Sequence, residues 1–323
     1  MAVAYKHRTK EITSIRRAVI ATKLGRLGWI ILRTVLVGGL CFMILYPLIV
    51  KLTSAFMHVD DMYDATVRFV PRTLTLQQFQ IAWEWMNYPR TLANTLALTI
   101  IVSALQLISC TLVGYGFGRF NFRGRSIAFA LVLLTLVVPP EMVMIPLFLN
   151  FRFFTFFGLI PEPGINLLGS YWPYILTSST TMGLKNGLFI YIMSHFFHNM
   201  PDSLEEAAEI DGAGSFVTFL RIMLPGAKPA LVIVFLFAFV WQWNDLFYLN
   251  LFIRSGDGYL AFALQNFALR FVSNSPISNQ FPWHYRSLLN NAGMMLFMAP
   301  LLILYLFMQR HFVESIERTG LVG

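Results

Sequence analysis

The chain of 323 residues is 57% hydrophobic and only 12% charged, with a mean hydropathy of +0.63 and a formal net charge of +8. A soluble domain carries about 25% charged residues, and several runs here approach the roughly 20 apolar residues that cross a bilayer, so a single soluble core is excluded. An excess of Lys and Arg in a membrane protein marks cytoplasmic loops, which makes nucleic-acid binding the weaker interpretation.

The first part of the chain alternates basic and apolar segments. A basic arm over residues 1–26 lacks the apolar core of a cleavable signal peptide, and the first span is expected over 27–54. Residues 55–90 contain several acids and predict an extramembrane loop with little helix. A second span is expected over 92–117, followed by a short turn with three arginines over 119–125.

Prolines interrupt the next hydrophobic run. The third span is expected to start near Ile127, and prolines inside a span kink it and free carbonyl groups; they are Pro139, Pro140 and Pro146. The aromatic and Gly/Pro-rich segment 149–172 is predicted to lie at or outside the membrane interface. A fourth span is expected to end near Phe197, and a run of polar residues over 178–185 blurs its start.

The last part contains a polar double helix, predicted over 201–224, between two apolar segments. The fifth span is expected over 227–252 and the sixth over 288–308, with a loop over 254–286 and a tail over 309–323. The sequence therefore predicts an all-α, polytopic membrane protein with six transmembrane helices. The spacing of histidines and of Cys41 and Cys110 indicates neither a metal site nor a disulfide framework.

The distribution of basic residues predicts the topology. Lys and Arg concentrate in the N-terminal arm and in the 119–125 turn, and both segments lie inside if six spans start from the cytoplasm. Six spans that start in the cytoplasm also put the polar double helix and both termini in the cytoplasm, and the 254–286 loop outside. No internal repeat argues for an inverted-repeat secondary transporter.

The polar double helix shows start and stop signals. Asp202 is predicted to cap the first helix, with Glu205 in capping-box register. Gly212 supplies a left-handed stop, a second short helix is expected over 215–221, and Pro225 is expected to end it.

The same segment carries an extended motif, EAA-x3-G-x9-I-x-L-P, just before a membrane span. Its residues are Glu206, Ala207, Ala208, Gly212, Ile222, Leu224 and Pro225. An ordinary amphipathic loop helix would explain the acid and the alanines alone. The full spacing instead favours a surface that another protein grips, with small alanines allowing close approach.

On these residues the chain resembles the permease subunit of a bacterial ABC importer of the maltose-type, carbohydrate-uptake group, over about residues 70–323. Further matches come from the spans and the tail. They are Asn94-Thr95-Leu96, Gly114 to Arg119, Pro140, Pro146, Trp243-Asn244-Asp245, Gln309 to Val313 and Thr319-Gly320. The chain departs from the family where Gly114 and Gly116 replace alanines, and where the 149–185 region is longer than usual.

The resemblance implies a mechanism and partners. Residues 27–323 would form the transmembrane domain of the importer in the bacterial cytoplasmic (inner) membrane, paired with a second permease subunit in a heterodimer. Residues 201–225, which we call the coupling loop, would dock on one of two ATPase subunits that hold ATP and Mg. A binding protein would deliver a sugar or oligosaccharide from outside. This chain would not be an enzyme, since it has no phosphate-binding P-loop.

Two polar groups within spans are candidates for the substrate path. Glu141 follows two prolines, and Trp243, Asn244 and Asp245 lie at the end of the fifth span. Intramembrane acids are functional candidates by default, and aromatic faces and amides suit sugar rings. The alternatives are that Glu141 faces water at a membrane edge and that the Trp-Asn-Asp group makes interhelical hydrogen bonds.

Other functions fit the sequence less well. An importer permease for a peptide or a glycerol phosphodiester would share most of the motifs. A standalone channel or membrane enzyme would need a selectivity filter or a catalytic constellation, and the sequence indicates neither.

Overall fold

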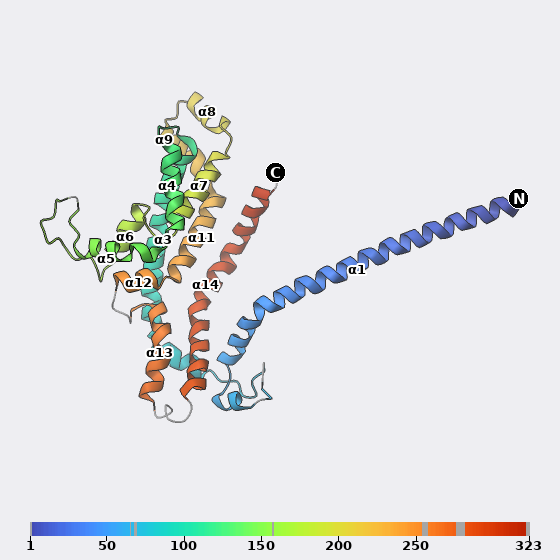
Figure 1. The fold of residues 1–323 in the computed structure, drawn as a ribbon, viewed down its shortest axis with the longest axis horizontal. Helices are drawn as coiled ribbons and strands as arrows, with labels where there is room; N and C mark the ends of the chain where they lie inside the picture. The colour runs from blue at the N-terminus through green and yellow to red at the C-terminus, as the bar shows by residue number, and fades with distance from the viewer. Residues whose placement is uncertain are drawn as a thin grey trace. The chain divides into compact units, whose positions relative to one another are not determined.

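A computed structural model gives the fold, drawn in Figure 1. It describes residues 2–64, 66–67, 70–156, 158–253, 258–275 and 282–320. The chain forms two compact units, Met1–Leu76 and Gln77–Gly323, which are described separately. Within the described ranges the secondary structure is helical, with isolated β-bridges at Met57–Leu74 and Phe154–Ile165.

The first unit consists of one long helix and a folded loop. α1 (Ala2–Ala55) includes the basic arm, and its Gly25–Ala55 part is long and apolar enough to cross a membrane, as the sequence predicted. The short helix η1 (Val59–Tyr63) follows. Most side chains of the arm lie outside the described residues.

Acidic residues hold the loop after α1 together. The buried Asp61 carboxylate accepts hydrogen bonds from the backbone N–H groups of Arg72 and Thr73, at 3.0 and 3.2 Å. Asp64 pairs with Arg72 at 2.7 Å. Hydrogen bonds from Thr66 and the charge of Arg72 hold the pKa of Asp64 below its usual range. The expected extramembrane loop is therefore a structured one.

The second unit begins with helix where the sequence predicted little. α2 (Gln77–Trp85) lies inside the expected 55–90 loop, so that prediction was wrong for its last part. α2 is amphipathic and buries Gln78 and Ala82, and it packs against α13 and α14. Tertiary packing of one face stabilises such a short helix, whose propensity alone is weak.

The remaining helices of this unit follow in chain order. They are α3 (Tyr88–Arg119), α4 (Arg125–Val137), η2 (Pro140–Val143), α5 (Met144–Arg152), α6 (Trp172–Ser179), α7 (Asn186–His198), α8 (Ser203–Ile210), α9 (Ser215–Thr218), η3 (Phe219–Met223), α10 (Leu224–Gly226), α11 (Lys228–Trp243), α12 (Phe247–Phe252), α13 (Leu260–Asn274) and α14 (Pro282–Gly320).

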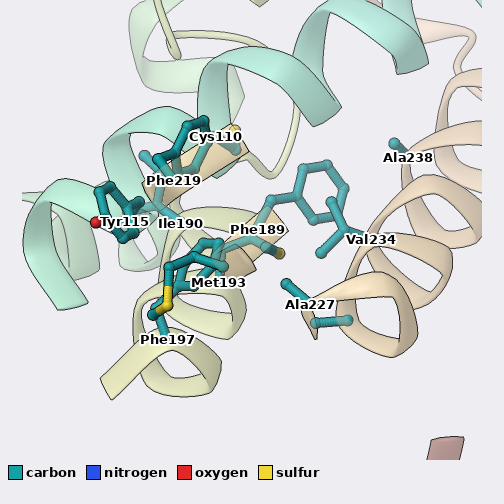
Figure 2. Packing of buried hydrophobic residues seen from close by; sticks show 12 residues of the cluster. Cys110, Tyr115, Phe189, Ile190, Met193, Phe197, Phe219, Ala227, Val234 and Ala238 are labelled. Carbon is teal, nitrogen blue, oxygen red and sulfur yellow. The ribbon is translucent and has the colours of Figure 1, made fainter. Parts of the chain in front are cut away.

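The central helix is α3, which packs on α7 and α11. Figure 2 shows the buried cluster that they share, which includes Phe189 and Met193 of α7, Cys110 of α3 and Val234 of α11. In Figure 1, α8 and α9 lie at the same end of this bundle as the end of α14, and α13 lies at the other end.

Helix length and bending decide which segments resemble spans. Besides α1, the helical stretches Tyr88–Arg119 and Tyr285–Gln309 are long and apolar enough to cross a membrane. Two bent pairs raise the number of candidates to as many as 5 among the described residues. One pair, α4 with η2 and α5, is bent by 99° at Pro139-Pro140, as the prolines predicted.

The expected fourth span is divided into α6 and α7, with a non-helical break over 180–185. Side chains of α3 form hydrogen bonds to residues at and beside this break. The Gln106 amide donates to the Leu184 carbonyl at 2.9 Å and to the Asn186 side chain at 2.7 Å, and the Ser109 hydroxyl donates to the Ser178 carbonyl at 2.6 Å. These bonds satisfy carbonyls that a broken helix leaves free.

The fifth expected span is also interrupted, because α11 ends at Trp243 and α12 starts only at Phe247. The 254–286 loop contains the helix α13, which the sequence analysis missed; residues 254–257 and 276–281 are outside the described part. At the start of α13, the Thr95 hydroxyl accepts a hydrogen bond from the Leu260 N–H at 2.9 Å. The tail from Gln309 continues α14 as far as Gly320. The side chains after Gln309 lie outside the described part of the structure.

Candidate functional site

The coupling loop forms a compact helical hairpin at one end of the bundle (Figure 1). α8 ends at Ile210, and Gly212 follows with a φ of +78°. Glycine adopts a left-handed conformation without the steric cost that other residues meet, and the predicted left-handed stop at Gly212 is confirmed. The Ala213 N–H bonds back to the Ala208 carbonyl at 2.9 Å, and α9 starts at Ser215.

The start of α8 differs from the predicted capping box. Asp202 is at the N-cap position with helical backbone angles, and its side chain makes no capping hydrogen bond. Its carboxylate instead bonds the Arg119 guanidinium, and Glu205 accepts a hydrogen bond from the Tyr115 hydroxyl at 2.9 Å. The capping prediction was wrong because tertiary partners on α3 compete for both carboxylates.

The outer face of the hairpin presents acid, alanine and apolar side chains. Glu206 and Ala207 are exposed, whereas Ala208 is only 2% exposed and faces inward. Ile210 is 86% exposed and Phe216 69% exposed. These apolar side chains, beside an exposed carboxylate, are open to contact with another protein.

The inner arm of the hairpin is anchored in the core. Phe219 and Met223 of the π-helical segment η3 are buried in the cluster shown in Figure 2. The Tyr115 ring lies 4.7 Å from the Phe219 ring and 5.2 Å from the Phe197 ring. The exposed arm is therefore continuous with a buried arm in contact with α3 and α7.

The last residues of the motif lie between η3 and the next helix. Ile222 and Leu224 are half-buried, and Pro225 is exposed. Pro225 does not end the helix as predicted, since the helical stretch Ser215–Gly226 continues one residue past it. The chain bends after Gly226, by 75° between the Ser215–Gly226 stretch and α11.

Arg119 contacts three groups at the start of the hairpin. Its guanidinium donates to the Met200 carbonyl at 2.7 Å, bonds Asp202, and places Nε 3.6 Å from a Glu205 oxygen. The Arg119 side chain is 5% exposed, while that of Asp202 is 83% exposed. A buried guanidinium requires such partners, because its charge is costly to remove from water.

Glycines bring α3 and α7 into close contact beside Arg119. A Cβ on Gly114 would lie 2.5 Å from the Met193 Cβ, and a Cβ on Gly118 would lie 2.9 Å from the Ser194 carbonyl oxygen. The i, i+4 spacing of two glycines is a close-packing pattern of membrane helices. The departure from alanine at Gly114 thus has a packing reason, whereas a Cβ at Gly116 would meet nothing within 4 Å.

The predicted substrate-path residues take different environments. Trp243 and Asp245 are buried, and Asn244 is exposed. Asp245 accepts hydrogen bonds from the Tyr174 hydroxyl at 3.3 Å and the Tyr248 N–H at 3.1 Å. Glu141 is exposed at the bend between α4 and α5.

Sequence reasoning used Arg119 in the basic 119–125 turn and Tyr115 in a family match, but it predicted no contact for either residue or for Gln106 and Ser109. Gly114 and Gly118 gave a usable signal through their spacing, and Tyr115 and Arg119 follow each of them by one residue. The partners of Gln106 and Ser109 are 69 to 80 residues away in sequence, and no local pattern indicates them. Within the described part of the chain, no three His, Cys, Asp or Glu side chains cluster as a metal site.

Comparison with known proteins places this architecture in a family. The model of the binding-protein-dependent transport system inner membrane component matches residues 110–318. The chain is 26% identical to the arabinooligosaccharides transport system permease protein AraQ of Halalkalibacterium halodurans, over 92% of this chain and 97% of that protein. It is 29% identical to the maltodextrin transport system permease protein MdxG of Bacillus subtilis, over 88% and 93% of the two chains.

A solved structure has the same fold. It belongs to a bacterial ABC transporter involved in the import of the acidic polysaccharide alginate, and it aligns with a TM-score of 0.69 at 22% identity, covering 87% of this chain and 95% of that one. With the family model matching well over half of the sequence, this chain belongs to the inner membrane components of binding-protein-dependent transport systems.

Proposed function

We propose that this chain is the permease subunit of an ABC importer that carries a sugar or oligosaccharide across the bacterial inner membrane. The names of its relatives support a carbohydrate substrate, since they refer to arabinooligosaccharides and maltodextrin. The chain crosses the membrane six times in this proposal, with α6 and α7 together forming the fourth span. Both termini and the coupling loop face the cytoplasm.

The coupling loop docks on a partner ATPase subunit. The observation that supports this assignment is that the hairpin has one exposed face and one arm buried in the core. Its outer face exposes Glu206, Ala207, Ile210 and Phe216. Its inner arm buries Phe219 in the core. An element that is open on one side and anchored on the other can bind a partner and transmit its movement to the bundle. ATP and Mg are held by two such ATPase subunits, and this chain performs no hydrolysis.

Substrate passes between this chain and a second, different permease subunit after delivery by an external binding protein. Trp243, Asn244, Asp245 and Glu141 are the candidates for contact with the path. Asn244 and Glu141 have exposed side chains, which supports direct contact for these two. Trp243 and Asp245 are buried in this chain and would position the others.

Reconstitution of the whole importer tests the proposal. The chain is co-expressed with a candidate second permease, ATPase subunits and binding protein from the same genome, and the complex is placed in liposomes. For the wild-type chain we expect ATP-dependent uptake of an oligosaccharide and co-purification of the ATPase subunits. In the variants Ile210→Asp and Phe216→Asp we expect the ATPase subunits no longer to co-purify. Retained ATPase binding in both variants would remove the docking assignment, and uptake of only a peptide or a glycerol phosphodiester would remove the sugar assignment.

A further inference from the structure

Helix α8 has little to hold it in place by itself. It has 8 residues, of which only Ala208 is buried, and isolated helices of this length are marginal in water. Its N-cap side chain makes no capping hydrogen bond. The orientation of α8 must therefore come from contacts outside the helix.

Two residues of α3 supply those contacts at the start of α8. Arg119 reaches the Met200 carbonyl and the carboxylates of Asp202 and Glu205. Tyr115, one turn earlier on the same face of α3, donates to the second oxygen of Glu205 at 2.9 Å. The planar guanidinium holds its N–H donors in a fixed fork, and here it bonds the Met200 carbonyl and the Asp202 carboxylate just before α8 and lies 3.6 Å from Glu205 in the first turn of that helix.

The same stretch of α3 is packed closely against α7. Gly114 and Gly118 allow backbone contact with Met193 and Ser194. The Tyr115 ring packs against Phe197 of α7 and Phe219 of η3. A displacement of α8 therefore meets a stiff pair of helices, one of which runs the length of the bundle.

We propose that Arg119 and Tyr115 are positioning residues that link the coupling helix α8 to the α3–α7 pair, so that a movement imposed on α8 is transmitted to the transmembrane bundle. This inference rests on the proposed docking of the coupling loop on an ATPase. It concerns the transmission step inside this chain and leaves the docking surface itself unchanged.

Arg119→Ala in the fully assembled importer is the main test. The exposed docking residues remain, so we expect ATPase subunits to co-purify in normal amounts and ATP hydrolysis to continue. Uptake per ATP hydrolysed is expected to fall roughly tenfold, the scale of losing a hydrogen bond to a charged group. Tyr115→Phe keeps the ring packing and removes only the bond to Glu205, so a smaller fall of the same ratio is expected.

Two further variants separate positioning from folding. Arg119→Lys keeps the charge but has no planar fork, and it is expected to recover part of the ratio. Arg123→Ala removes an exposed arginine from the adjacent turn, and the ratio is expected to stay at the wild-type value. A purely structural role for Arg119 would lower uptake and hydrolysis together through a loss of assembled complex.

The outcomes also separate this inference from the docking proposal. An unchanged ratio of uptake to hydrolysis in Arg119→Ala overturns the inference, and so does a proportional loss of both activities with less complex. A different measurement shows whether the docking proposal is wrong. In that case the ATPase would remain bound to the Ile210→Asp and Phe216→Asp variants.

Discussion

Gly118 of α3 and Phe197 of α7 are packed so closely that a Cβ at residue 118 would lie 2.9 Å from the Phe197 Cβ. We expect Gly118→Val to force α3 and α7 apart and to destabilise the protein by about 1 to 3 kcal/mol, the usual cost of overpacking. Thermal unfolding of the purified protein in detergent measures this effect.

Gly116→Val is the matched control, since a Cβ there meets nothing within 4 Å. It is expected to unfold at nearly the wild-type temperature. Equal unfolding temperatures for the two valine variants would contradict the close contact between α3 and α7.

A bulky residue at Gly212 should disrupt the turn of the coupling loop. Its φ of +78° costs an L-residue about 1 to 2 kcal/mol, and Gly212→Val is expected to reorient α8 while the chain still inserts in the membrane. Uptake per ATP hydrolysed in proteoliposomes should therefore fall. Gly214→Val serves as the comparison, because Gly214 has a φ of −73° and open space around it. Undiminished coupling in Gly212→Val would count against the account.

Phe219 and Phe216 lie three residues apart with opposite expected roles. Phe219 is buried against Tyr115 and Phe197, so Phe219→Ala should lower stability by about 3 to 5 kcal/mol through the cavity it leaves. Phe216 is 69% exposed, and Phe216→Ala should leave the unfolding temperature unchanged while weakening ATPase binding. Measuring the unfolding temperature and the ATPase binding of both variants checks that the hairpin has a buried and an exposed side. If both variants gave the same result, or if Phe216→Ala lowered stability and Phe219→Ala did not, the hairpin would not have these two sides.

Gln106 is expected to hold the break of the fourth span. In Gln106→Leu the Leu184 carbonyl and the Asn186 side chain lose their donor, which costs about 1 to 3 kcal/mol if they remain buried without a partner. Hydrogen exchange over residues 180–186 should become faster. The exposed Gln265 of α13 provides the control Gln265→Leu, for which exchange in this segment should not change. Equal exchange in both variants would show that Gln106 does not stabilise the break.

The sequence predicted features that depend on neighbouring residues. Hydropathy gave the first span, Pro139-Pro140 gave the bend after α4, and Gly212 gave the left-handed stop, because each follows from the chemistry of a few consecutive residues. The start and stop signals between Asp202 and Ser215 likewise gave the two helices of the 201–225 segment.

Features that depend on tertiary partners were missed. Asp202 looked like a helix cap, but Arg119 of α3 takes its carboxylate. Pro225 looked like a helix end, but the helical stretch continues through it to Gly226 before the bend into α11. The helix α13 was missed because a window from residue 254 to 286 mixes its apolar face with polar flanks, and contacts with α2, α3 and α14 stabilise it.

The side of the membrane on which the coupling loop lies is the measurement that tests the central claim most directly. A single cysteine at Ala207→Cys, in a chain carrying Cys41→Ser and Cys110→Ala, is exposed to a membrane-impermeant maleimide in intact spheroplasts and in inside-out vesicles. We predict labelling only in inside-out vesicles stripped of ATPase, and protection when the purified ATPase is added back. Labelling from outside intact spheroplasts, or labelling that the ATPase does not reduce, would contradict the account.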